Sequence, residues 1–148
     1  MKTNFEDILK KIEQLVEEDK PELLKQICQT LKEEVYHYDW VGFYSLKDGG
    51  LELGPYAGKP TDHTYIAIGK GVCGQVAESG KTMVVQDVSL EDNYIACSID
   101  VQSEIVVPVL KNGKFIAELD IDSHSPAPFT QSDTDFLEKV CEMISTKF

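Results

Sequence analysis

The chain has no uninterrupted apolar run of about 20 residues, the length that a helix needs to span a bilayer. Its first residues, MKTNFEDILKK, also lack the continuous hydrophobic stretch of a secretory signal. Basic side chains are scarce, because 14 Lys and Arg stand against 26 Asp and Glu, for a formal net charge of −12. Nucleic acids and anionic lipid surfaces are bound by basic patches. We therefore expect a cytoplasmic protein that binds neither nucleic acid nor membranes.

Close cysteine pairs are also missing. No two cysteines stand at the C-x2-4-C spacing of zinc sites, and the histidines are scattered. A chain of 148 residues can build its own core without a framework of disulfides. We therefore expect no metal site and no structural disulfide. The residues concerned are Cys28, Cys73, Cys97, Cys141, His37, His63 and His124.

Hydrophobic periodicity divides the chain into helices and strands. Apolar residues three and four apart predict helices over 5–16 and 24–35, and a last one over 136–144. Asp48-Gly49-Gly50 and Asn112-Gly113 are turn signals typical of hairpins, and GKGVCGQVAESG predicts a short helix that ends near Gly80. Runs of β-branched and aromatic residues predict strands over 40–46, 51–57, 65–68, 82–85, 104–110 and 114–121.

This order of elements predicts an α+β fold. The hairpins imply a central antiparallel sheet of about six strands, and the N- and C-terminal helices are expected to pack together on one face of it. We expect one domain over 1–148, with a helix pair at 1–36, the sheet and active-site loops at 40–123, and a helix at 130–148.

The four cysteines have different surroundings. Cys28 and Cys141 lie on apolar helix stripes, where a free cysteine behaves as a small buried hydrophobe. Cys73 lies in Gly-Val-Cys-Gly near a predicted helix start, where the glycines leave little shielding and the helix dipole would lower the thiol pKa. A tight helix start with an incidental small residue explains that motif equally well. Cys97 lies in a polar, irregular segment from Gln86 to Asp100, and such long loops are often functional.

Acidic and aromatic residues also recur on the predicted strands. Glu104 opens an apolar strand, and Asp120 and Asp122 alternate with apolar residues, so that both point to one sheet face. Such carboxylates could bind an amine, or they could form a solvent-facing edge. Trp40 and Tyr44 share one parity in their strand and belong either to the core or to a pocket wall.

Together these pieces resemble the free methionine-(R)-sulfoxide reductases, a family built on a GAF domain. The resemblance covers nearly the whole chain and implies thiol-dependent reduction of free L-methionine-(R)-sulfoxide, without a metal or organic cofactor. It also implies thioredoxin as the reductant and leaves a homodimer open. The matching stretches are DWVGFYSL, LELGPYAGKP, GKGVCG, YIAC, SEIVVPVLKNGKFIAELDIDS and FTQSDTDFLE.

The resemblance assigns roles to individual residues. Cys97, in its IAC context, matches the cysteine that attacks the sulfoxide sulfur, and Cys73 matches a resolving cysteine 24 residues earlier. The acidic set of Glu104, Asp120 and Asp122 matches the residues that hold the sulfoxide and amino groups. Trp40 and Tyr44 match the aromatic walls around the substrate methyl group.

One position departs from this pattern. Many family members carry a third cysteine ten residues before the cysteine of GVCG, and here that position is His63. The departure leaves Cys73 as the matched thiol to resolve Cys97, through a Cys73–Cys97 disulfide. Alternative hypotheses are a non-catalytic GAF module that binds a small ligand, a thiol redox sensor that uses the same cysteine pair, and a structural scaffold.

Overall fold

The computed structural model describes residues 3–94 and 99–148. Its six strands form one antiparallel sheet in the order β3-β2-β1-β6-β5-β4, which confirms the predicted sheet. In chain order the elements are α1 (Phe5–Glu18), α2 (Leu23–Glu34), β1 (Trp40–Lys47), β2 (Gly50–Ala57), β3 (Tyr65–Ala67), α3 (Gly71–Ser79), β4 (Met83–Val85), the 3₁₀ helix η1 (Val88–Leu90), β5 (Ser103–Lys111), β6 (Lys114–Ser123), α4 (Gln131–Met143) and the 3₁₀ helix η2 (Ser145–Lys147).

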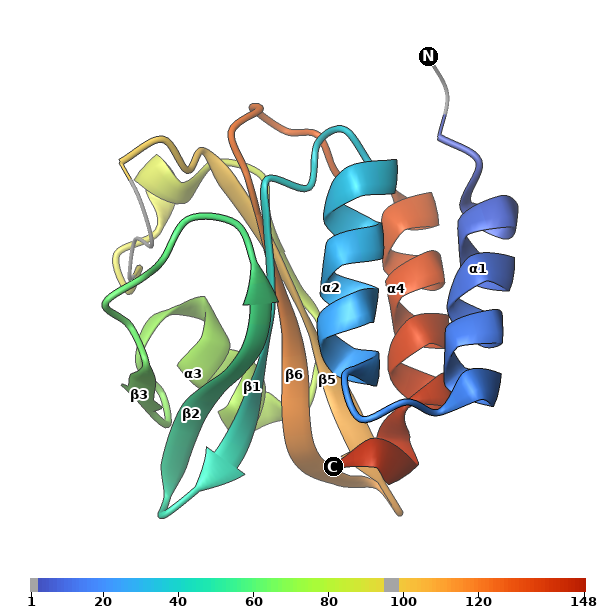
Figure 1. The fold of residues 1–148 in the computed structure, drawn as a ribbon. Helices are drawn as coiled ribbons and strands as arrows, with labels where there is room; N and C mark the ends of the chain where they lie inside the picture. Colours follow the sequence, from blue (N-terminus) through green and yellow to red (C-terminus); the bar gives the residue numbers. More distant parts are fainter. Residues whose placement is uncertain (1–2, 95–98) are drawn as a thin grey trace.

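Helices cover the sheet on both faces. The terminal helices α1, α2 and α4 lie side by side on one face, as predicted, and the short helix α3 lies on the other (Figure 1). The segment from Gln86 to Asp100, predicted to be irregular, contains the single 3₁₀ turn η1 before the undescribed residues 95–98. Within the described parts of the chain, no helix has the length and apolar character to cross a membrane.

Local sequence explains where these elements start and turn. Both predicted hairpin turns have positive φ at both central residues, 53° and 78° at Asp48-Gly49 and 53° and 77° at Asn112-Gly113. This is the backbone of type I′ turns, whose twist matches that of the paired strands. The side chain of Asn4 caps α1, and Gly80 ends α3 in the left-handed conformation, as predicted for that glycine.

The alternation of side chains along the strands creates two separate cores. On β6, Ala117, Leu119 and Ile121 pack under the terminal helices. On β1, Trp40 and Tyr44 face the opposite way and pack in the smaller cluster around α3. The even-numbered acidic residues of β6 have the parity that faces this second side. The α3 face of the sheet is therefore the one that carries the predicted functional residues.

A buried polar network joins the start of α4 to the segment before β1. One Asp133 carboxylate oxygen lies 2.9 Å from His37 Nε2 and accepts a 2.7 Å hydrogen bond from the Tyr38 hydroxyl. The other oxygen accepts from the backbone N–H and hydroxyl of Thr130, which completes the capping box of α4. Although burial raises the pKa of Asp133, the hydrogen bonds from His37, Tyr38 and Thr130 outweigh it, so the pKa lies below its usual range.

Candidate active site

The strand register places the acidic residues of β5 and β6 next to one another. Asp122 pairs with Trp40 of β1 on one side and with Glu104 of β5 on the other. Two residues along, Asp120 lies between Gly42 and Val106, and a further two along, Glu118 lies between Tyr44 and Pro108. Paired residues of neighbouring strands point to the same face. All four carboxyl-bearing residues of this set are at most 4% exposed, so the acidic set is not a solvent-facing edge.

Helix α3 brings Cys73 down onto these carboxylates. Gly74 lets it approach, because a Cβ at that position would lie 2.6 Å from the carbonyl oxygen of Ala67. Asn93 holds the start of the helix by accepting from the N–H of Gly71 and donating to the carbonyl of Gly69. Both glycines of GVCG thus have structural work: Gly71 adopts a φ of 63°, and Gly74 permits close packing.

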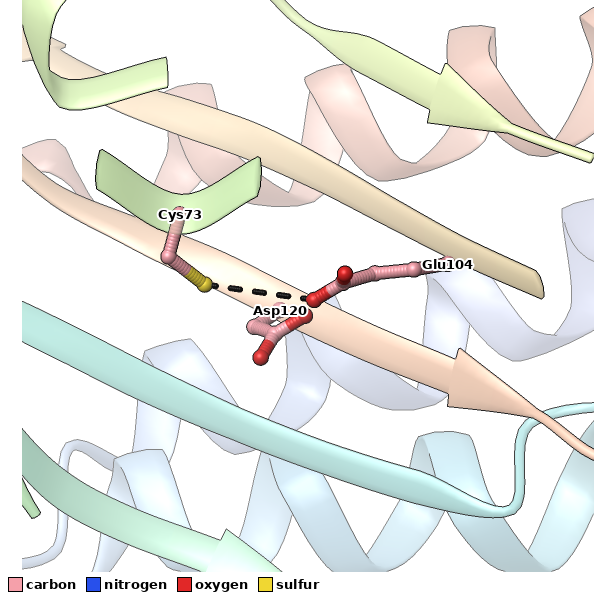
Figure 2. Close-up of side chains that lie close together, drawn as sticks. All are labelled: Cys73, Glu104 and Asp120. Carbon is pink, nitrogen blue, oxygen red and sulfur yellow. Dashed lines mark hydrogen bonds between the residues drawn. The ribbon is translucent and has the colours of Figure 1, made fainter. Parts of the chain in front are cut away.

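Cys73, Glu104 and Asp120 meet in the space between α3 and the sheet (Figure 2). The Cys73 sulfur lies 4.0 Å from Glu104 Oε2. One ligand atom from each of the three residues lies within 4.8 Å of the others, so this group could hold a metal ion. Their proximity is a property of the fold, since helix α3, β5 and β6 each supply one of the three.

The pKa values of this cluster are shifted by burial. The prediction that the helix start would lower the pKa of Cys73 is wrong, as is the expectation that its glycines leave it unshielded. Cys73 is 5% exposed, and burial followed by the charges of Asp120, Glu118 and Glu104 raises the pKa of the thiol well above its ordinary value. Burial likewise raises the pKa of Glu118 and of Asp120. Resting Cys73 is therefore a neutral thiol.

Trp40 and Tyr44 flank the cluster along β1. The Trp40 indole N–H donates to the carbonyl of Lys59 at 3.0 Å, and its ring lies over Gly42, where a Cβ would clash with it. The Tyr44 hydroxyl donates to the carbonyl of His63 at 2.8 Å. Both aromatic residues thereby hold the loop that follows β2 against the sheet.

A small cavity of about 10 Å³ lies at the centre of this arrangement. This volume suits roughly one water-sized occupant. Its described lining includes four of the residues singled out from the sequence, together with His63, the residue in the place of the third family cysteine. The lining consists of Tyr44, His63, Ile66, Lys70, Gly71, Val72, Cys73, Glu104 and Asp120.

The structure brings together most, though not all, of the predicted site. Trp40 and Asp122 are buried nearby but do not line the cavity, and Cys97 lies outside the described residues. Sequence reasoning missed Glu118, which is fully buried and whose carboxyl group interacts with the Cys73 thiol. Its parity could have revealed it, because it precedes Asp120 by two residues on the same strand.

The other two described cysteines are buried on the opposite face, which confirms their assignment as core residues. Burial raises the pKa of Cys28 to about 12 and that of Cys141 further still. Cys28 Sγ lies 3.6 Å from the carbonyl oxygen of Pro55, and Cys141 packs on β5 near Val107. Neither thiol is available for reaction in this state.

Comparison with known proteins identifies the fold. The GAF domain family model matches residues 19–148. The X-ray structure of free methionine-R-sulfoxide reductase from Neisseria meningitidis in complex with its substrate superposes with a TM-score of 0.90 at 36% identity, over 97% of this chain and 87% of that one. The reduced form of fRMsr of Staphylococcus aureus gives a TM-score of 0.91 at 36% identity, over 99% and 96% of the two chains. The chain is thus a GAF-domain protein with a buried thiol and carboxylates under α3.

Sequence comparison shows which family of GAF-domain proteins the chain resembles. The free methionine-R-sulfoxide reductase of Saccharomyces cerevisiae is 40% identical over 123 residues, which are 80% of this chain and 68% of that protein. The chain belongs to the free methionine-R-sulfoxide reductase family. The resemblance drawn from its motifs is confirmed.

Proposed function

We propose that this protein reduces free L-methionine-(R)-sulfoxide to L-methionine. The observation that carries the proposal is the buried group of Cys73, Glu104 and Asp120 beside Tyr44, in a chain of this family. Nucleophilic, acidic and aromatic groups in one pocket suit a substrate that has an electrophilic sulfur, a cationic amine and an apolar methyl group. Recognition of the charged α-amino group would restrict the reaction to the free amino acid.

The chemistry begins at Cys97. Its thiolate attacks the sulfoxide sulfur while Glu104 gives a proton to the sulfoxide oxygen; the oxygen passes to the cysteine, and methionine leaves. The Cys97 sulfenic acid then condenses with the Cys73 thiol, which forms a disulfide and releases water. Thioredoxin, a dithiol, opens that disulfide by exchange. No metal or organic cofactor takes part in these steps.

Glu104 is the candidate acid because it shares a hydrogen bond with the buried Asp120 carboxyl group. Burial raises the pKa of neighbouring Asp120, and a hydrogen bond from Glu104 to Asp120 opposes this shift without cancelling it. Two carboxyl groups that share a hydrogen bond in a dry pocket hold a proton between them, since both cannot ionise at low cost. That proton is the one that the sulfoxide oxygen receives.

Asp120 and Asp122 are assigned to the substrate ammonium group, and Trp40 and Tyr44 to its methyl group. A cavity of about 10 Å³ is far smaller than an amino acid, so the lining must move outward to admit it. The 58–64 segment is the candidate for this movement, because its residue His63 lines the cavity, and the hydrogen bonds from Trp40 and Tyr44 would have to break as it moves.

The test is to incubate the protein with each epimer of free methionine sulfoxide and dithiothreitol, and to measure methionine release. We expect release from the R epimer, and little from the S epimer or from a peptide that contains methionine sulfoxide. The Cys97→Ser variant is the matched control and should release none. Comparable rates on the peptide, or no release from either epimer, would reject the proposal and leave the redox-sensor hypothesis.

A further inference from the structure

We propose that the reduced protein binds one thiophilic divalent cation of the Zn²⁺ class through Cys73, Glu104 and Asp120, with Glu118 as the fourth ligand. The binding itself stands on the geometry of the cluster. Its consequence, that the ion holds the enzyme in an inactive state, rests on the proposed function. Cysteine and histidine spacing cannot reveal such a site, because three of its four ligands are carboxylates from two strands.

The three described ligand atoms are close to a coordinating arrangement. They lie within 4.8 Å of one another, and the Cys73 sulfur is 4.0 Å from Glu104 Oε2. Around a tetrahedral Zn²⁺, with Zn–S near 2.3 Å and Zn–O near 2.1 Å, neighbouring ligand atoms are about 3.5 Å apart. The groups would therefore close in by about 1 Å, a movement that side-chain rotation supplies. All three point into the same space (Figure 2).

Glu118 gives the independent sign of a missing ligand. Its side chain has no solvent exposure, and neither carboxylate oxygen has a hydrogen-bond partner among the described residues. Glu118 lies two residues before Asp120 on β6 and therefore points to the same face of the sheet, and its carboxyl group interacts with the Cys73 thiol. Asp120 Oδ1 is likewise buried, and the part of the chain that the structure describes holds no hydrogen-bond partner for this oxygen. Buried polar atoms without partners are costly, and a cation among them would satisfy several at once.

The donor set selects the kind of cation. A thiolate with carboxylate oxygens suits Zn²⁺ or Co²⁺, whereas Mg²⁺ and Ca²⁺ take six or more oxygen ligands, often including water. The cavity of about 10 Å³ has room for one atom-sized occupant, which is too little for a hydrated octahedral ion. On coordination the Cys73 thiol loses its proton to solvent, and so do the carboxyl groups that hold one, including the proton shared by Glu104 and Asp120; bonds from sulfur and oxygen to the metal replace the bonds to hydrogen.

Occupation by the ion would stop turnover at two points. The bound Cys73 sulfur is no longer free to attack a sulfenic acid, and Glu104 and Asp120 are no longer free to hold the sulfoxide and ammonium groups. Oxidation of Cys73 removes the thiolate ligand, so only the reduced protein has the site. The metal ion and the substrate would thus compete for the same residues.

The experiment is a Co²⁺ titration of the metal-free, phosphine-reduced full chain, with Zn²⁺ displacement to obtain the affinity. We expect one Co²⁺ per chain and a thiolate-to-cobalt charge-transfer band. Cys73→Ser should abolish the band, and the control Cys28→Ser should keep it, since Cys28 lies on the other face. Glu118→Gln should weaken Zn²⁺ binding about 10-fold or more while retaining the band. Circular dichroism of each variant checks that it is folded.

Three results would overturn the inference: no band in the parent chain, a band that persists in Cys73→Ser, or equal Zn²⁺ affinity in the parent and Glu118→Gln. Methionine release in a single turnover without external reductant separates this test from that of the proposed function. One equivalent of Zn²⁺ should suppress the release, and a chelator should restore it. A cobalt band without any release from the metal-free protein would reject the reductase function alone. Release without a band would reject the metal site alone.

Discussion

Buried acidic groups on the two faces of the sheet differ in their hydrogen bonding and in the direction of their pKa shifts. Under the terminal helices, Asp133 has hydrogen-bond partners for both oxygens, and its pKa lies below its usual range. Under α3, Glu118 and Asp120 are at least as buried, yet three of their four carboxylate oxygens lack a partner among the described residues, and burial raises their pKa values. A satisfied carboxylate stabilises a fold, whereas an unsatisfied one costs stability unless a ligand completes it. This contrast supports a stabilising role for the first face and the proposed binding role for the second.

The largest expected difference between the two faces of the sheet is in the effect of cysteine substitutions on turnover. We predict that Cys73→Ser releases about one equivalent of methionine and then stalls when thioredoxin is the only reductant, because no disulfide forms for thioredoxin to open. Cys28→Ser and Cys141→Ser should keep most of the turnover and lose about 1–3 kcal/mol of stability through a buried hydroxyl. Methionine release with a thioredoxin system measures all three. Full turnover by Cys73→Ser would show that another route reduces the Cys97 sulfenic acid.

The largest effect on stability is expected at Asp133. The Asp133→Asn variant should lower the free energy of unfolding by about 3–5 kcal/mol, because it removes a buried charge on which His37, Tyr38 and Thr130 converge. Denaturant unfolding at neutral pH measures the loss. Turnover per folded molecule should stay unchanged, since the network lies on the face away from Cys73. A loss below 1 kcal/mol would contradict the stabilising role of the network.

The opposite change in the free energy of unfolding is expected for a substitution at Glu118. Glu118→Met keeps the length of the side chain and removes two buried carboxylate oxygens for which the described ranges 3–94 and 99–148 offer no hydrogen-bond partner. It should raise the free energy of unfolding by about 1–3 kcal/mol, which is the cost of burying an unpaired polar group. The same denaturant series measures this gain. Destabilisation by this variant would mean that the carboxyl group supports the fold.

The pH dependence of these two variants should also differ in sign. The contribution of Asp133 to stability is present above its unfolded pKa of about 3.9 and is lost as the pH falls through its lowered folded pKa. The contribution of Glu118 is present below about 4.3 and is lost as the pH rises through its raised folded pKa.

Unfolding of the parent and both variants across the acid range tests this contrast. The deficit of Asp133→Asn should shrink on acidification below about pH 4, and the gain of Glu118→Met should grow as the pH rises above that value. Two differences that change in the same direction would contradict the assignment of opposite roles.

The sequence predicts the architecture well and the environment of the site less well. Helical and strand periods, with two Asx-Gly turns, are local signals, so the element order and the antiparallel sheet follow from them. Alternation places Asp120 and Asp122 on one face, but it cannot say whether that face is covered. The cover is α3, which can approach because Gly74 lacks a side chain. Burial under α3, followed by the charges of Asp120, Glu118 and Glu104, which lie 31 to 47 positions away in the sequence, raises the pKa of the Cys73 thiol, and no local sequence signal reveals these causes.

The two fully buried tyrosines supply the smallest contrast. The Tyr38 hydroxyl donates to the Asp133 carboxylate, whereas the Tyr44 hydroxyl donates to the neutral backbone carbonyl of His63. Hydrogen bonds to a charged group contribute about 1.5–3 kcal/mol and those to a neutral group about 0.5–1.5 kcal/mol. Tyr38→Phe should therefore cost more stability than Tyr44→Phe.

The effects of the two tyrosine substitutions on kinetics should have the reverse order, with the larger effect from Tyr44→Phe. Tyr44→Phe removes the hydrogen bond that connects β1 to the backbone of His63 in the 58–64 segment, and it removes a polar atom from a residue of the cavity wall, so KM for the sulfoxide should change by a few-fold. Tyr38→Phe should leave both kcat and KM as they are, because its hydroxyl lies on the stabilising face. Steady-state kinetics and denaturant unfolding of the two variants, side by side, give the comparison. A Tyr44→Phe enzyme with parental KM would mean that the Tyr44–His63 hydrogen bond stabilises the fold and does not affect substrate binding. The α3 face of the sheet would then contain stabilising residues as well as binding residues.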